Sequence, residues 1–485
     1  MNNSKRIISH GSVYLFGDLL RYSVSLIMLP IYTRYLTPED YGTVELLSML
    51  IDFAAILFGA RVGQSVFRFY CSAKSESEKK SIISSALLLG FVFNGAGALA
   101  VILFSEQLAL LIFSDAGFKD EIILFTLTMF MLPLIEIPLV HIRADKKPWL
   151  FFSASLIKLL LQLSLNIYFV VYKNLHVEGV IYSAVISSTV MAALLTGRSL
   201  LHVGFNASIK VCKKLFGFSL PIKIATIGSF YLAFGDRYIL NQFTDLTQVG
   251  LYALGYKFGF IFMLLSWTPF EKIWDSEKYA IHKTENAVAT YQKTFLYFNI
   301  IMITLGLCIS LFVKDLLKIM SAPEFHSAYK IVPIIIFAYI FQAWSKYCDL
   351  GILLSKKTSH IAIAEAIAVV IITIAYLSLI PAYGIYGAAV ATVIGFIVRF
   401  LWINYKGSQL YNMNLPWRKV IMLVTAASVC LGFSYLVTED ILLSISARML
   451  ILCVFIASVF TLPILSREEK QELLQKGKQL TKRFR

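Results

Sequence analysis

Residues 362–380 read AIAEAIAVVIITIAYLSLI, an apolar run interrupted by a single acidic residue. A helix of this length crosses the ~30 Å hydrocarbon core of a bilayer. Similar runs recur from one end of the chain to the other, separated by short polar segments. A membrane β-barrel would instead show segments of about ten residues with alternating polarity. The sequence therefore predicts an all-α polytopic membrane protein.

The composition agrees with this fold class. Of the 485 residues, 58% are hydrophobic and 15% are charged, whereas about a quarter of a soluble domain is charged. The net charge of +15 is expected to lie largely on cytoplasmic loops and on the C-terminal tail, beside anionic membrane lipids, so no nucleic acid partner is required. The six cysteines form no CxxC pair, so we expect no metal site and no cofactor.

About fourteen transmembrane helices are expected, and a cytoplasmic N-terminus gives the best charge distribution. This orientation leaves only five basic residues for external loops, namely Lys119, Lys173, Lys314, Lys318 and Lys330. Because cytoplasmic loops carry an excess of Lys and Arg, both termini are expected in the cytoplasm and the protein in the cell inner membrane. The spans are predicted at residues 11–34, 43–69, 82–104, 121–142, 148–172, 178–200, 216–240, 248–271, 292–313, 329–354, 360–380, 384–405, 418–437 and 445–465.

Three sequence echoes indicate an internal repeat. Short acidic turns end at Gly42 and Gly250, Lys146-Lys147 matches Lys356-Lys357, and GVIYSAV from residue 179 matches GIYGAAV from residue 384. The copies lie about 205 to 210 residues apart. Six spans separate them, so the two copies should cross the membrane in the same direction.

The repeat predicts two parallel six-helix lobes. We expect an N-lobe over residues 1–210 (spans 1–6), a C-lobe over 211–410 (spans 7–12), two further spans over 411–466 and a basic cytoplasmic tail over 467–485. Two such lobes around a central site are typical of a secondary transporter.

Basic residues inside the predicted spans form the candidate site. Each would cost ~2.5 to 3.5 kcal/mol at the centre of a lipid-exposed helix, so the deep ones should face a wet interior. A cavity lined by cations selects an anion, and arginine suits phosphate because its planar fork donates two parallel hydrogen bonds. The candidates lie on spans 1, 2, 7 and 8: Arg21, Arg61, Arg68, Lys223, Arg237 and Lys257.

Internal salt bridges are the alternative explanation for some of these charges. Asp18 with Arg21, or Lys346 with Asp349, would pair at three-residue spacing. Local pairing cannot explain Arg61, Lys223 and Lys257, which have no acidic residue three or four positions away. The acidic residues Asp18, Asp52 and Asp236 are therefore expected either to pair with cations or to bind a coupling ion.

Two prolines are candidate hinges, because Pro30 and Pro221 interrupt the leading helix of each predicted lobe. The sequence has no GxxxxGK[ST] motif for nucleotide hydrolysis and no HExxH or GxSxG motif for covalent chemistry. We therefore expect a transporter and not an enzyme.

Several segments resemble a known family. They are LPIYTRYLTPEDYGTV at 29–44, residues 63–70, GDRYIL at 235–240 and YGIYGAAVAT at 383–392. The chain is similar in these segments to the polysaccharide transporter or O-antigen (Wzx-type) flippase family, a branch of the multidrug, oligosaccharidyl-lipid and polysaccharide exporter superfamily. The resemblance covers nearly the whole chain and implies a MATE-like fold.

The resemblance also implies a function. It implies that the protein flips an undecaprenyl-pyrophosphate-linked oligosaccharide repeat unit from the inner to the outer leaflet, by alternating access, for O-antigen, capsule or exopolysaccharide assembly. It makes Arg21, Arg61, Lys223 and Lys257 candidates for binding the pyrophosphate or acidic sugars. A polysaccharide polymerase and a chain-length regulator are the protein partners that it implies.

Two other functions remain open from the sequence. An ion-coupled multidrug exporter of the same fold would use Asp18 or Asp52 as its ion site, although buried cations outnumber buried acids. A membrane oligosaccharide polymerase or ligase would need a long external loop, and the longest predicted ones, at 105–121 and 314–328, are short.

Overall fold

The computed structural model describes residues 27–436, 441–465 and 469–470. Over these residues the chain is helical and contains no strand, which confirms the predicted all-α fold class. The helices group into two compact units, Met1–Leu251 and Tyr252–Arg485. Each unit is described by itself, and the four predicted domain ranges stay predictions.

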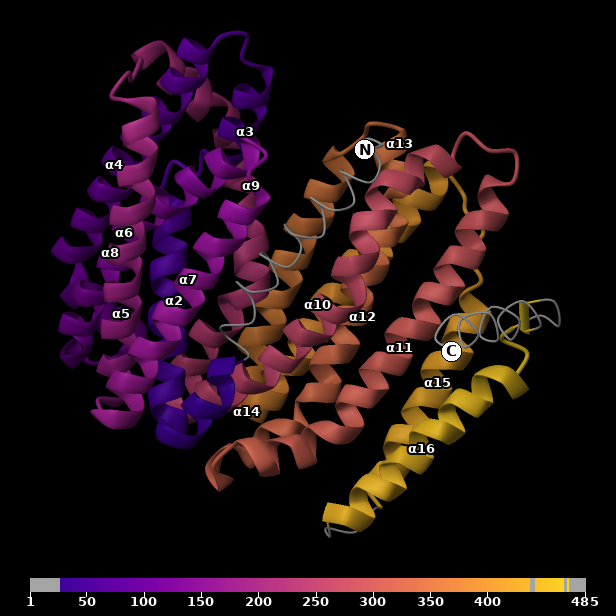
Figure 1. Cartoon of the computed structure of the whole chain (residues 1–485). Helices are drawn as coiled ribbons and strands as arrows, with labels where there is room; N and C mark the ends of the chain where they lie inside the picture. The colour runs from indigo at the N-terminus through magenta and orange to yellow at the C-terminus, as the bar shows by residue number, and fades with distance from the viewer. Residues whose placement is uncertain (1–26, 437–440, 466–468, 471–485) are drawn as a thin grey trace, which may run out of the picture. The chain divides into compact units, whose positions relative to one another are not determined.

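The first unit begins with a helical segment at residues 27–35, which contains Pro30. The helices that follow, shown in Figure 1, are α2 (Pro38–Phe58), α3 (Gly63–Ser72), α4 (Glu76–Leu103), α5 (Ser105–Phe113), the 3-10 turn η1 (Ala116–Phe118), α6 (Lys119–Ala144), α7 (Pro148–Asn166), the π-helical turn η2 (Ile167–Tyr172), α8 (His176–Val203), α9 (Ile209–Phe243) and the start of α10 (Leu246–Ile281).

A capping box fixes the start of α2. The Thr37 hydroxyl accepts a hydrogen bond from the Asp40 amide at 3.1 Å, and the Asp40 carboxylate accepts one from the Thr37 amide at 3.0 Å. These bonds satisfy two amide groups that have no partner within the helix. The α10 helix starts in a related way, because the Asp245 carboxylate accepts the Gln248 amide at 2.8 Å.

The second unit contains the rest of α10 and the remaining helices. They are α11 (Ala287–Met320), the 3-10 helix η3 (Pro323–Lys330), α12 (Val332–Cys348), α13 (Leu350–Leu354), α14 (Ser359–Leu410), α15 (Trp417–Ser434) and α16 (Ile441–Thr461). Stacked aromatic rings fill part of its core, with centroids 4.2 Å apart for Phe270 and Phe298 and 4.3 Å apart for Trp274 and Tyr347. Such pairs add to the stabilisation from burial alone.

The described residues contain ten helices that are long and apolar enough to span a membrane, or up to twelve if each of two bent pairs is one span. The α14 helix counts once in this total although it is broken at Gly384, where φ is +52° and ψ is −128°. That break separates the predicted spans 360–380 and 384–405. Most of the first predicted span and most of the tail lie outside the described residues, so the number fourteen stays a prediction.

The predicted span 43–69 is wrong as a single helix. The chain leaves the helical conformation at Gly59, whose φ and ψ of −63° and 151° are extended, and it re-enters a helix at Gly63. Between these points Arg61 has a left-handed φ of +42°. Irregular backbone at membrane depth is tolerated only where protein or a wet cavity surrounds it, so this break is a place to look for function.

The repeat seen in the sequence reappears in the backbone of two turns. Lys146 and Lys356 both have a φ of +56°. The amides of Lys147 and Lys357 both donate at 3.1 Å, to the carbonyls of Ile142 and Ile352 respectively. Each unit therefore contains the same turn between two helices, α6 and α7 in the first unit and α13 and α14 in the second. The two turns lie about 210 residues apart.

Candidate functional site

Arg61 is placed by the break between α2 and α3. A left-handed conformation costs a residue other than glycine on the order of 1 to 3 kcal/mol, and such strain gathers at functional sites. The Arg61 side chain is exposed and lines a cavity together with Asn94, Pro133 and Glu136. It makes no hydrogen bond or ion pair with any other residue that the structure describes. We call this space the Arg61 cavity.

Carboxylates accompany this guanidinium. Asp52 is attracted by Arg61 and repelled by Glu45 and Glu136, so all three groups lie within electrostatic reach of Asp52. Glu136 itself lines the Arg61 cavity. The cavity can therefore offer a guanidinium fork to an anion and carboxylate oxygens to a proton or metal cation.

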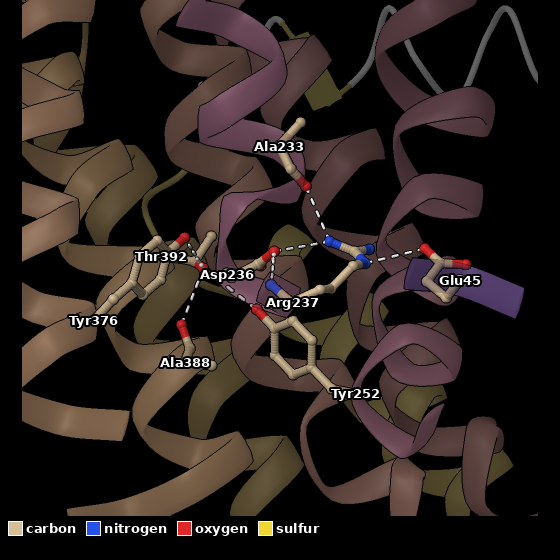
Figure 2. A network of polar contacts seen from close by, with 8 residues as sticks. All are labelled: Glu45, Ala233, Asp236, Arg237, Tyr252, Tyr376, Ala388 and Thr392. Carbon is tan, nitrogen blue, oxygen red and sulfur yellow. Dashed lines mark hydrogen bonds and ion pairs between the residues drawn. The ribbon is translucent and has the colours of Figure 1, made fainter. Parts of the chain in front are cut away.

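Arg237 is in a different situation, because acids pair with it directly. Its Nη1 lies 2.9 Å from Asp236 and its Nε lies 3.0 Å from Glu45, and the side chain is almost fully buried (Figure 2). Nη1 also donates to the Ala233 carbonyl at 3.0 Å. A buried pair of this kind is costly to break, since the remaining charge is left uncompensated. Asp236 thus forms an ion pair with Arg237.

Lys223 lies on α9, two residues after Pro221. The two parts of this helix, residues 209–224 and 226–243, meet at a bend of 40°, so Pro221 lies close to a real bend. The Lys223 side chain is half-buried, and the described part of the chain gives it no ion pair. After Arg61, it is the second predicted cation for which the described residues provide no acidic partner.

The remaining predicted site residues have varied surroundings. The Arg68 guanidinium on α3 lies 4.7 Å above the Phe218 ring of α9, which is a cation–π contact. Beside it, the Ser219 hydroxyl donates to Ser65 at 3.0 Å and ties the two helices together. Lys257 lies half-buried on α10 in the second unit. Arg21 and Asp18 lie outside the described residues.

Sequence reasoning missed polar contacts in each of the two units. Glu45 was not among the candidate residues, and it lies 192 positions from the Arg237 it binds, so no local spacing could reveal it. Thr392 in the second unit lies 3.2 Å from the Tyr376 hydroxyl and 3.4 Å from that of Tyr252, and it donates to the Ala388 carbonyl (Figure 2). Lys346 also has a partner other than expected, because it bonds Glu271 at 2.9 Å.

Comparison with known proteins gives a family match over more than half of the chain. A family model described as polysaccharide biosynthesis protein matches residues 7–268. A probable low-salt glycan biosynthesis flippase, Agl15 of Haloferax volcanii, is 25% identical over 295 residues, which is 57% of this chain and 60% of that protein. A membrane protein of Methanocaldococcus jannaschii is 23% identical over 56% of this chain and 54% of that protein. The alignments thus span less than two thirds of each curated relative.

Solved structures agree on the fold. The lipid II flippase MurJ in an inward closed conformation has a TM-score of 0.71 at 17% identity, covering 93% of this chain and 98% of that one. A multidrug resistance MATE family transporter in an inward-facing conformation has a TM-score of 0.64 at 14% identity, covering 82% and 95%. The predicted MATE-like fold is confirmed, and the chain is a multi-pass membrane protein.

Proposed function

The chain belongs to the polysaccharide biosynthesis protein family, and from that premise we propose that it is a flippase for a lipid-linked glycan precursor. Its cargo is an undecaprenyl-pyrophosphate-linked oligosaccharide repeat unit, carried from the inner to the outer leaflet of the cytoplasmic membrane. Transport proceeds by alternating access through a cationic central cavity and feeds O-antigen, capsule or exopolysaccharide assembly. Both termini lie in the cytoplasm in this proposal.

The observation that carries the proposal is the family match together with the fold shared with a lipid II flippase. The described side chains add chemical support. Arg61 presents its guanidinium to a cavity without forming an ion pair, and Lys223 also lacks an acidic partner within the described residues. A guanidinium with free donors suits the oxygens of a pyrophosphate. Arg237, neutralised by Glu45 and Asp236, contributes structure more than charge.

An assay in liposomes tests the proposal directly. The purified chain is reconstituted with a fluorescent polyprenyl-pyrophosphate oligosaccharide, and the fraction of probe protected from dithionite is followed with time. We expect faster exchange between leaflets than in empty liposomes. Exchange at the rate of empty liposomes, with correctly inserted protein, would contradict the proposal, and drug export without glycan movement would favour the multidrug exporter.

Substitutions at Arg61 test its role in transport with variants that should keep the fold. Arg61→Gly suits the left-handed backbone at this position, so folding should be retained while transport falls about tenfold or more. Arg61→Lys should keep part of the activity, because it retains the charge but not the fork. Lys210→Gln, an exposed cation at the start of α9, is the matched control and should be neutral. Full activity of Arg61→Gly would remove Arg61 from the substrate path and leave the flippase proposal itself in place.

A further inference from the structure

A second polar cavity lies at the ends of α6 and α8 in the first unit, away from Arg61. It is lined by His141, Asp145, Lys147, Arg198, Ser199 and His202. We call it the α6–α8 pocket. The predicted orientation puts it on the cytoplasmic side, where the predicted spans 121–142 and 178–200 end.

The pocket has a rigid frame around Asp145. This carboxylate accepts a hydrogen bond from the Tyr70 hydroxyl of α3 and one from the Lys147 ammonium at 2.8 Å. His141 Nε2 lies 3.7 Å from the same carboxylate, and His141 Nδ1 lies 3.3 Å from the Ser199 hydroxyl. Helices α3, α6, α7 and α8 are thereby joined around one acidic group.

Two further donors of the pocket remain unused. Arg198 and His202 lie one turn apart on α8, are exposed, and make no hydrogen bond or ion pair with the rest of the described chain. Asp145 already has two donors, so the charges of Arg198 and Lys147 exceed the single negative charge. The negative ends of α6 and α8 offset part of this excess, while the N-terminus of α7, at Pro148, adds to it.

An apolar groove runs beside the charged donors on the adjacent face of α8. It is lined by Gly197, Leu200, Leu201, Gly204 and Phe205. Leu201 and Phe205 are 88% and 80% exposed, so no other described element covers them. Positions 198 and 202 lie next to 197 and 201 around the helix, which places cationic donors directly beside an apolar surface.

We propose that the α6–α8 pocket binds the phosphate group of an anionic phospholipid from the surrounding membrane, with an acyl chain lying in the groove of Leu201 and Phe205. Arg198 supplies a planar fork for the phosphate oxygens, and His202 and Lys147 add donors. We assign the phosphate to a lipid because an acyl chain would cover the apolar groove, whereas a free phosphate would leave the groove uncovered. This site is independent of the transported cargo.

The comparison within the chain supports a built site. With the repeat offsets, His141 corresponds to Gly351 and His202 corresponds to Gly407. In the second unit these two glycines pack so closely that a Cβ on Gly351 would lie 2.2 Å from the Gly407 carbonyl oxygen. Histidines thus replace glycines where the first unit opens the pocket.

Native mass spectrometry of the purified full-length chain tests the proposal, with three probes. Dioleoyl phosphatidylglycerol supplies phosphate and tails, diacylglycerol supplies tails alone, and inorganic phosphate supplies the anion alone. We expect phosphatidylglycerol to bind about tenfold more weakly to Arg198→Gln/His202→Gln than to the wild type. Lys210→Gln/Lys213→Gln, which removes two exposed cations of α9 outside the pocket, should bind within about twofold of the wild type.

The remaining arms separate the two sources of phosphate. Leu201→Gln should weaken phosphatidylglycerol and leave inorganic phosphate unaffected, and diacylglycerol should not distinguish the Arg198/His202 variant from the wild type. Equal binding of phosphatidylglycerol by the wild type and the Arg198/His202 variant would overturn the site. Displacement of the lipid by an equal concentration of inorganic phosphate would overturn its assignment to a lipid. The single variants Arg198→Gln and His202→Gln serve if the double variant fails to fold.

Discussion

The ends of α6 and α8 in the first unit and of α13 and α14 in the second unit are two versions of one structure. In each unit a left-handed lysine follows the first of the two helices, Lys146 after α6 and Lys356 after α13, and the amide of the next lysine donates to the corresponding carbonyl, that of Ile142 or Ile352. The residues at the corresponding positions of the two units differ. The second unit brings two backbones together through Gly351 and Gly407, whereas the first unit has His141 and His202 and a pocket.

This difference teaches that the backbone frame of a repeat can persist while its contacts diverge. A glycine pair allows two helices to touch through their backbones, which is a common way to pack membrane helices without polar groups. Large polar side chains at the same positions keep the helices apart and require a network such as that of Tyr70, Asp145 and Lys147. The contact in the second unit is therefore closed by backbone packing, whereas the α6–α8 pocket in the first unit is held open by hydrogen bonds.

The largest effect should come from filling the glycine contact. In Gly351→Ala the new methyl group would lie 2.2 Å from the Gly407 carbonyl oxygen, so the helices must separate. Overpacking of this kind costs about 1 to 3 kcal/mol, with the upper end expected where backbone blocks the way. Thermal unfolding in detergent, followed by the loss of the monodisperse peak in size-exclusion chromatography, measures this loss.

The matched control is Gly197→Ala at the end of α8, where a Cβ would meet nothing within 4 Å. This variant should unfold at the wild-type temperature or slightly above it, because alanine favours a helix over glycine. Equal stabilities of the two variants would show that the Gly351 contact is not tight in the membrane protein.

Much of the fold could be predicted from the sequence, because a bilayer permits few choices. A chain that crosses it must satisfy its backbone within helices, and the length of a helix follows from the thickness of the hydrocarbon. The break at Gly384 lies at the predicted gap between the spans 360–380 and 384–405. The break at Gly59 was not predicted, because apolar residues on both sides hide it.

The candidate site was harder to predict, because charge pairing in this protein is not local. Arg237 binds Glu45 from a helix nearly two hundred positions away, and Arg448 binds Asp315 from another helix of the second unit. A spacing rule on one helix cannot find such partners. It did single out Arg61, Lys223 and Lys257 as cations without a local acid, and the described residues give Arg61 and Lys223 no ion pair.

A smaller effect should distinguish the α6–α8 pocket from its apolar counterpart in the second unit, because only the contribution of the pocket to stability should depend on pH. Burial alone would raise the pKa of Asp145, but the hydrogen bonds from Lys147 and Tyr70 more than offset it and hold the pKa below its usual value. The charged form is therefore favoured by folding, and its contribution is present above the unfolded pKa and lost as the pH falls through the folded one. Asp145→Asn should cost about 1 to 2 kcal/mol.

The pH profile of unfolding temperature checks this assignment. The difference between the wild type and Asp145→Asn should stay constant from about pH 8 to pH 5 and shrink below about pH 4, near the unperturbed value for aspartate. Ser355→Ala, at the corresponding position of the second unit, should show no such dependence. A difference that disappears already at pH 6 would mean that Asp145 is not stabilised as the charged form.

The smallest effect should come from the two lysines that share a left-handed conformation. Because Lys146 and Lys356 both have a φ of +56°, replacing either with glycine removes a cost of about 1 to 2 kcal/mol. The greater conformational freedom of glycine in the unfolded chain opposes folding and offsets about 0.5 to 1 kcal/mol of this stabilisation. Each variant should therefore unfold at the wild-type temperature or a little above it. Equal shifts for both would confirm that the turns are equivalent in energy as well as in geometry, whereas a loss in Lys146→Gly alone would assign the Lys146 side chain a role in the first unit that Lys356 lacks.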